Sequence, residues 1–258
     1  VVSIPAYNEE KSIGEVIKDI HKVMKSKRYD YKILVLDDGS KDQTAKIAKK
    51  AGAIVFSHPY NQGLAATFRD EIKKALDLKA DIIVHTDADG QYQARDITKL
   101  IQEIKNNDLV LGSRFLGVIE SMPLMKRLGN KAFSRVISGI IKYKVYDCQT
   151  GFRAFTKDVA KSISIISDYT YTQEQVIRVV KQGYKIKEIP VYFAKRKYGK
   201  SKLISNPFNY AVKSWINLLR IYRDYTPIKF FGFFGLTFLS IGFLIGIWLL
   251  YLFIKTGK

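Results

Sequence analysis

Residues 81–91 read DIIVHTDADGQ, an apolar run that ends in an acidic turn with one glycine. A short apolar run bounded by turn residues is typical of a buried β-strand. The same pattern of a β-rich run, a polar turn and an amphipathic stretch recurs along the first two hundred residues. It predicts strands at 1–5, 33–36, 53–57, 81–86 and 108–111. Strands that alternate with helices predict an α/β fold with a mostly parallel, doubly wound sheet.

The polar turns after these strands hold the candidates for chemistry, because ligands of such sheets bind beyond the carboxyl ends of the strands. Asp87 and Asp89 are two residues apart, a spacing that can place both carboxylates on one side of an extended turn. Gln91 adds an amide oxygen. Hard oxygen ligands, completed by diphosphate oxygens, suit Mg²⁺ or Mn²⁺. A solvated, helix-capping turn is the alternative explanation for an isolated D-x-D.

Composition narrows the class of protein. The chain has 258 residues, 47% of them hydrophobic, which is enough for one packed α/β domain and an appendage. Its formal net charge of +19 indicates an anionic partner, which can be nucleic acid, a lipid surface or a phosphorylated substrate. The single cysteine, Cys148, excludes an internal disulfide and a Cys-rich zinc site and favours a reducing compartment.

The C-terminal part of the chain favours a membrane over nucleic acid. Residues 230–254 read FFGFFGLTFLSIGFLIGIWLLYLFI without a charge, roughly 37 Å of helix against a hydrocarbon core of about 30 Å. Before this run, residues 206–225 have an apolar stripe opposite a polar one, which predicts a helix in the membrane interface. We expect no cleavable signal peptide, and a cytoplasmic basic domain by the positive-inside bias. The predicted division is 1–203, 204–227 and 228–254.

Six motifs stand in one order along the chain: IPAYNEE from residue 4, VLDDGSKDQT from 35, HTDADGQ from 85, LGSRF from 111, DCQTGFRAF from 147 and KYGKSKL from 197. In this order they resemble family-two glycosyltransferases of the GT-A fold, most closely the dolichyl-phosphate mannose synthases and related polyprenyl-phosphate hexosyltransferases. The resemblance implies a Rossmann-like GT-A domain. It also implies metal-dependent, inverting transfer of a hexose onto dolichyl or polyprenyl phosphate at the cytoplasmic membrane face, with GDP-mannose favoured as donor.

The same resemblance implies roles for residues in these motifs. It puts Pro5, Tyr7 and Glu9 in the nucleotide pocket and Asp37 against the base or ribose. Val35 shares a strand face with Asp37, so we expect it near the base as well. Asp87 is expected near the sugar or ribose, and Asp89 and Gln91 at the metal. The donor-binding set is completed by Ala88, Arg114 and Lys202.

The acceptor phosphate requires cationic residues, because its dianion must approach an anionic sugar diphosphate. We expect Arg114, Arg127 and Arg196 to bind it, with Ser134 and Lys202 as supporting donors. In the resembling synthases the matching arginines bind phosphate. A phosphate monoester with a second pKa near about 6 is largely ionised at neutral pH, so its attack needs little general-base help. Catalysis would then rest on positioning and charge neutralisation.

Alternatives remain open at this point. UDP-glucose-dependent polyprenyl-phosphate enzymes share nearly every motif. Processive polysaccharide synthases carry a Q-x-x-R-W segment that is missing here, with Tyr171-Thr172-Gln173-Glu174 in place of their acid-rich segment. Glu174 could still contact acceptor or donor sugar. A non-catalytic membrane module that binds nucleotide-sugars is a different class, and the complete set of Asp87, Asp89, Gln91 and Arg114 argues against it. No motif supports nucleic-acid binding.

Overall fold

The computed structural model describes residues 1–166, 171–198, 216 and 219–257. Its strands are β1 Val2–Ala6, β2 Ile33–Asp37, β3 Ile54–Ser57, β4 Ile82–His85, β5 Leu109–Ile119, β6 Arg153–Thr156 and β7 Ile186–Phe193. Its helices are α1 Ile13–Ser26, α2 Thr44–Lys50, α3 Leu64–Asp77, the 3₁₀ turn η1 Ala94–Asp96, α4 Ile97–Glu103, α5 Leu124–Ile141, α6 Lys157–Ser162, α7 Tyr171–Lys181 and α9 Pro227–Thr256. The five predicted strands are present, and β6 and β7 are additional to them.

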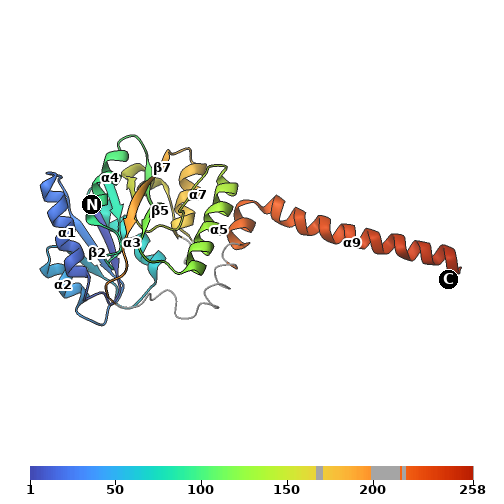
Figure 1. Cartoon of the computed structure of the whole chain (residues 1–258), viewed down its shortest axis with the longest axis horizontal. Coiled ribbons are helices and arrows are strands. Elements are labelled where there is room, and N and C mark those ends of the chain that lie inside the picture. Colours follow the sequence, from blue (N-terminus) through green and yellow to red (C-terminus); the bar gives the residue numbers. More distant parts are fainter. Residues whose placement is uncertain (167–170, 199–215, 217–218, 258) are drawn as a thin grey trace. The chain divides into compact units, whose positions relative to one another are not determined.

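The strands form one seven-stranded sheet in the order β3-β2-β1-β4-β6-β5-β7 (Figure 1). All neighbours are parallel except β6, which is antiparallel to both β4 and β5. The predicted α/β fold with a mostly parallel sheet is therefore confirmed. The reversed strand matters for the site, because its first residue, Arg153, pairs with His85 at the end of β4. The residues that precede β6 thus lie at the same sheet edge as the acidic turn that follows β4.

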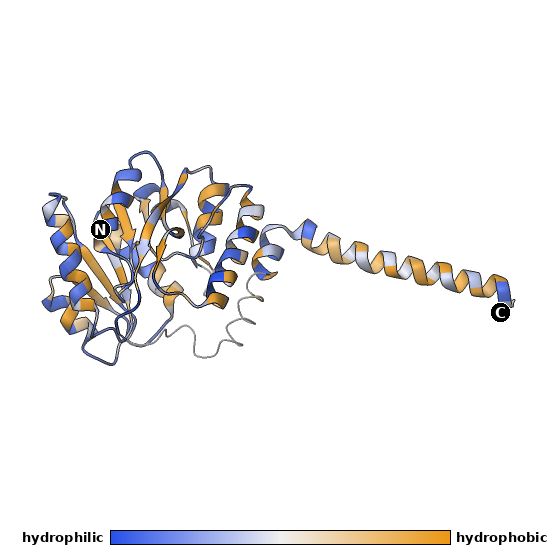
Figure 2. Ribbon diagram, viewed as in Figure 1, coloured by the Kyte–Doolittle hydropathy of each residue, from blue (hydrophilic) through white to orange (hydrophobic). Residues whose placement is uncertain are grey.

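Helices cover both faces of this sheet, as a parallel sheet requires. On one face, Ile13, Ile17 and Ile20 of α1 repeat at helical spacing and are at most 1% exposed. They pack in one apolar cluster with alternate residues of β1, β2 and β4 and with residues of α4. On the other face, Phe68 of α3 packs against Phe155 of β6 and Tyr171 of α7. Figure 2 shows the apolar strands between these layers.

The chain divides into two compact units, Val1–Pro207 and Phe208–Lys258. In the second unit, α9 begins with Pro227 in its first turn, where the missing N–H of proline costs nothing. The helix is 30 residues long, its most apolar 18-residue window has a mean hydropathy of 2.3, and none of that window is buried within the chain (Figure 2). By length and composition it can cross a membrane. Lys202 and most of the interfacial helix predicted over 204–227 lie outside the described residues.

Candidate active site

The acidic turn after β4 is held in shape by its own hydrogen bonds. The backbone N–H of Gln91 donates to Oδ1 of Asp89 at 2.9 Å, and Gly90 adopts the positive φ of 73° that the turn needs. Gln91 is also bound to Ala194, just after β7. Its backbone carbonyl accepts from Ala194 N at 2.8 Å, and its Nε2 donates to Ala194 O at 3.0 Å. The turn is therefore fixed to a segment that lies about a hundred residues later in the chain.

Asp89 is buried and in contact with a cationic side chain. It is 8% exposed, and the guanidinium of Arg196 contacts its Oδ2. Burial and the nearby charge of Asp87 raise the pKa of Asp89 to about 6, although Arg196 opposes this shift. A second guanidinium nitrogen of Arg196 lies 3.6 Å from Oε1 of Glu9. The ionised form of Asp89 thus depends on a cationic partner at its outer oxygen.

The oxygen atoms of this turn fit a divalent cation. Asp87 and Asp89 offer carboxylates, and the Nε2 bond of Gln91 leaves its amide oxygen, the atom that can ligate a metal, on the other branch of the amide. Within residues 1–166, 171–198, 216 and 219–257, no three His, Cys, Asp or Glu side chains converge on one metal position. Such a cation would complete its shell from substrate phosphates and water, as Mg²⁺ commonly does.

The segments after β1 and β2 form the wall beside the acidic turn. Ala6 and Asp37 are paired in the parallel register, so the predicted nucleotide residues Tyr7 and Glu9 lie next to the turn that follows β2. Two hydrogen bonds join the two turns, from Asn8 N to Ser40 Oγ at 2.8 Å and from Glu9 N to Thr44 Oγ1 at 2.7 Å. Tyr7 and Glu9 are half-buried and accessible from this edge.

Other residues predicted for the nucleotide pocket are more deeply placed. Pro5 and Ala88 are buried, and Asp37 is 3% exposed, with its Oδ1 accepting from Ser40 N at 3.2 Å. Val35 does share a strand face with Asp37, but that face turns into the apolar cluster under α1, where Val35 is completely buried. The structure therefore brings Asp37 to the site edge and leaves Val35 in the core.

Arg114 has a buried partner that the sequence pattern does not reveal. Its Nε and Nη2 donate to Oδ2 and Oδ1 of Asp147, each at 2.7 Å, and its backbone N–H donates to the same carboxylate. Asp147 is fully buried, and its own N–H donates to Glu188 at 2.9 Å. Asp147 opens the DCQTGFRAF motif, so the motif itself was the signal that could have identified it. The pair fixes the Arg114 side chain at the site edge.

The two residues of α5 that were predicted to bind the acceptor phosphate, Arg127 and Ser134, differ in their exposure to solvent. Arg127 is exposed, whereas Ser134 is buried, and its hydroxyl accepts from Cys148 N at 3.1 Å. Neither has a described contact with the acidic turn. Lys126, which the sequence analysis did not single out, is half-buried, and burial is the main cause that lowers its pKa. The charges that act on Lys126 come from the site itself: Arg114, Asp87, Arg196 and Asp89.

Two histidines, His58 and His85, and the carboxylate of Glu174 are each engaged by neighbouring side chains or backbone groups. His85 is fully buried with its Nδ1 2.8 Å from Glu71 of α3. His58 bridges Asp38 and Asp70 at 2.8 and 3.1 Å. Glu174 accepts from Ile166 N and from Arg178 Nε.

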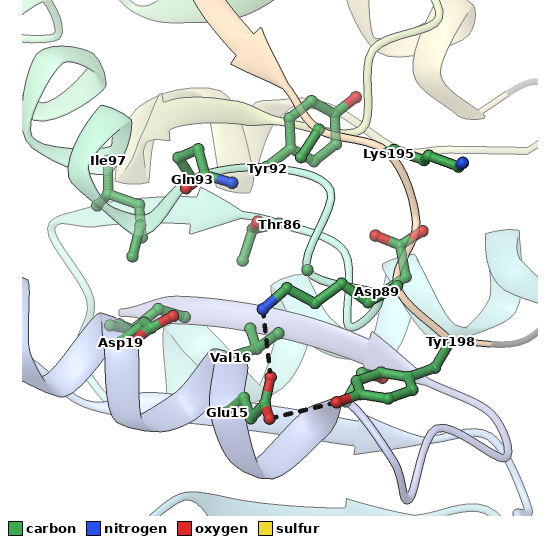
Figure 3. A pocket seen from close by; sticks show the side chains of 16 residues that line it. Glu15, Val16, Asp19, Thr86, Asp89, Tyr92, Gln93, Ile97, Lys195 and Tyr198 are labelled. Carbon is green, nitrogen blue, oxygen red and sulfur yellow. Dashed lines mark hydrogen bonds and ion pairs between the residues drawn. The ribbon is translucent and has the colours of Figure 1, made fainter. Parts of the chain in front are cut away.

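A cavity of about 150 Å³ opens beside Asp89 on the α1 side (Figure 3). One wall is the segment of residues 194–198, which we call the crossing segment because it runs from the end of β7 past the acidic turn to α1. Glu15 of α1 holds its far end, at 3.7 Å from Lys197 Nζ and 3.5 Å from the Tyr198 hydroxyl. Arg196 lies between this anchor and the Gln91–Ala194 bonds, so its guanidinium is confined near Asp89.

Comparison with known proteins places this arrangement among sugar-transferring enzymes. Residues 1–164 match the family described as Glycosyl transferase family 2. The chain is 36% identical over 212 residues to a UDP-N-acetylglucosamine–dolichyl-phosphate N-acetylglucosaminyltransferase of Methanococcus voltae, covering 73% of this chain and 82% of that protein. It is 33% identical over 211 residues to a dolichyl-phosphate hexose transferase of Haloferax volcanii, covering 80% and 86%.

The fold has solved counterparts as well. Glucosyl-3-phosphoglycerate synthase from Mycobacterium tuberculosis, in complex with Mn²⁺, uridine diphosphate and phosphoglyceric acid, superposes with a TM-score of 0.66 at 17% identity. The superposition covers 84% of this chain and 77% of that one. At this identity the likeness concerns the fold alone.

Proposed function

Because this chain belongs to glycosyl transferase family 2, we propose that it transfers a sugar from a nucleotide-sugar to a polyprenyl phosphate with inversion at the anomeric carbon. The observation that carries the proposal is the acidic turn itself. Asp87 and Asp89 follow β4 at the ligand edge of the sheet, and three basic side chains, Arg114, Lys126 and Arg196, exert their charges on them. Such a site pairs an anionic donor diphosphate with an anionic acceptor.

The donor side of the site is formed by the turns after β1, β2 and β4. Tyr7, Glu9 and Asp37 provide the edge for the nucleoside, and Asp87 is held next to Gly151, where the sugar or ribose is expected. A divalent cation, Mg²⁺ or Mn²⁺, held by Asp89, Gln91 and Asp87 would stabilise the charge on the departing nucleotide diphosphate. The protein groups supply orientation, since the phosphate nucleophile is already ionised at neutral pH.

The acceptor side is formed by basic residues. Arg114 is fixed by Asp147, so its guanidinium is pre-oriented before a phosphate arrives, and Arg196 is kept close to the site by its contact with Asp89. Lys126 adds an ammonium from the first turns of α5, and Arg127 remains a predicted contact from the exposed side of that helix. The contact predicted for Ser134 requires its O–H, which points to Cys148 Sγ at 3.5 Å, to turn to the phosphate, while its oxygen can keep accepting from Cys148 N.

Helix α9 supports a lipid-linked acceptor. A polyprenyl chain stays in the bilayer, and its extraction would cost about 0.8 kcal/mol per methylene group, so an enzyme anchored in the same membrane avoids that cost. We place the catalytic unit at the cytoplasmic face, because the full chain, with a net charge of +19, is rich in the Lys and Arg residues that the positive-inside bias favours on that side.

The direct test is an assay of the purified protein in lipid with polyprenyl phosphate and labelled GDP-mannose, UDP-glucose and UDP-N-acetylglucosamine. GDP-mannose is the donor that the motifs favour, and the relative with a UDP-N-acetylglucosamine name makes that donor the second candidate. We expect transfer from one donor, and at least a hundredfold loss in Asp89→Ala. Absence of transfer from all donors, full activity of Asp89→Ala, or undiminished activity of the unchanged protein in excess chelator would contradict the proposal.

A further inference from the structure

The contact between Arg196 and Asp89 has a consequence for the order of events in the site. The guanidinium occupies Oδ2 of Asp89, while Oδ1 is engaged by the N–H of Gln91. Because Oδ1 already accepts the N–H of Gln91, Oδ2 is the oxygen of Asp89 that a metal would bind. A cation on that oxygen and a guanidinium on the same oxygen repel each other at contact distance, in a site where Asp89 is only 8% exposed.

We propose that Arg196 and a divalent cation compete for Oδ2 of Asp89, so that the arriving cation displaces the Arg196 guanidinium. This inference rests on the proposed metal-dependent transfer, because the cation is the one assigned to the acidic turn there. The exchange makes Arg196 a positioning residue that neutralises Asp89 in one state and offers its charge to an incoming phosphate in the other.

The structure limits how far the displaced side chain can travel. The crossing segment is bound at Ala194 by two hydrogen bonds to Gln91 and at Lys197 by Glu15, on either side of Arg196. Arg196 also lies 3.6 Å from Glu9, on the loop after β1. A guanidinium that loses the Asp89 contact therefore still has Glu9 as a partner.

The negative charge of the surrounding carboxylates favours replacement of the guanidinium by a divalent cation. Asp87, Asp89 and Glu9 make this corner acidic, and the displaced guanidinium keeps Glu9 as its partner. A divalent cation puts two positive charges on Oδ2 of Asp89, where the guanidinium put one. The exchange therefore brings the corner closer to neutrality at the moment when the donor diphosphate supplies further negative charge.

The test is Mn²⁺ binding without substrates, measured on the full chain in lipid by electron paramagnetic resonance of the unbound ion. Because the competing ion pair is lost, Arg196→Ala should bind Mn²⁺ roughly 3- to 30-fold more tightly than the unchanged protein. Arg196→Lys, which keeps the charge, should change the affinity less. Mn²⁺ should also raise the melting temperature of Arg196→Ala more than that of the unchanged protein.

Lys197→Ala is the matched control, since it removes the adjacent positive charge, which pairs with Glu15 and not with Asp89. Unchanged or weaker Mn²⁺ binding in Arg196→Ala overturns the competition, and so does an equal gain in Lys197→Ala. Asp89→Asn separates the two proposals. If it abolishes Mn²⁺ binding while Arg196→Ala leaves the affinity unchanged, the metal site stands and the exchange is wrong.

Discussion

At the scale of single residues, the buried pair of Arg114 and Asp147 is the clearest difference between pattern and structure. A guanidinium in a basic chain is by default exposed, yet Arg114 is 5% exposed and bidentate to a fully buried carboxylate. The pair gives Arg114 one orientation, which a phosphate-binding residue needs. The backbone N–H of Asp147 donates to Glu188 of β7, and this hydrogen bond links the site to that strand.

Asp147→Asn should therefore damage both stability and transfer. The substitution leaves the charge of Arg114 buried beside a weaker acceptor, and the free energy of unfolding should fall by about 3 kcal/mol. Denaturant unfolding of the full chain and transfer assays measure the two effects. The control is Asp19→Asn, at an exposed position of α1, which should change stability by less than about 0.5 kcal/mol. Equal stability of the two variants would show that Arg114 does not depend on Asp147.

Cys148 is a second buried residue next to the site whose surroundings the sequence does not reveal. Burial raises the pKa of its thiol to about 12, and its backbone N–H donates to Ser134. Reactive cysteines have low pKa values and access to solvent, so Cys148 is structural.

At the scale of elements, the position of β6 between β4 and β5 shapes the acidic turn. The residues before β6 pass close to Asp87, and a Cβ atom on Gly151 would lie 2.9 Å from its Oδ1. Gly151 is thus required by close approach and not by a left-handed backbone. The antiparallel strand, which no predicted strand anticipated, is the element that brings this glycine to the site.

Gly151→Ala should reduce activity without unfolding the protein. The added methyl group can be accommodated if the Asp87 carboxylate moves, and a misplacement of about 1 Å at reacting groups can cost on the order of a hundredfold in rate. The melting temperature should change little, because the displaced atoms are the tip of one side chain. Gly139→Ala in α5, where a Cβ meets no atom within 4 Å, is the control and should keep full activity. Wild-type transfer by Gly151→Ala would show that the Asp87 position is not critical.

At the scale of the whole molecule, the chain joins the α/β unit Val1–Pro207, which carries the candidate site, to a second unit that contains the apolar helix α9. In α9 the apolar residues surround the helix on all sides, as expected for contact with lipid and not for an amphipathic surface helix (Figure 2). The charges lie near its two ends, at Lys229 and Lys255. This distribution is the basis for a prediction about membrane insertion.

Two charges at the centre of α9 should prevent stable insertion. Arginine costs about 2.5 to 3.5 kcal/mol at the middle of a spanning helix, so the double change Leu244→Arg with Ile245→Arg should release the protein from membranes at alkaline pH. The matched double change Ile228→Arg with Phe231→Arg, near the helix start, should remain in the membrane fraction. Retention of both variants would indicate that another part of the chain provides the attachment.

The sequence by itself determined the strands that end at the site, the D-x-D turn, the apolar C-terminal helix and the family. These features are local, since strand periodicity, turn residues and an uncharged run can each be read within about twenty-five residues. Strand ends also marked Tyr7, Glu9 and Asp37 as residues at the ligand edge, whereas their nucleotide-binding roles were implied by the family resemblance and stay predictions.

Only the tertiary structure decided which side chains meet. Arg196 contacts Asp89 across 107 residues, and Arg114 contacts Asp147 across 33, because the sheet order places β6 and β7 beside strands far from them in sequence. The burial of Val35 and the inward side of α5 were decided in the same way. A strand or helix pattern states that one face is apolar, but which layer covers that face depends on packing between elements, and that packing is not encoded in any one segment.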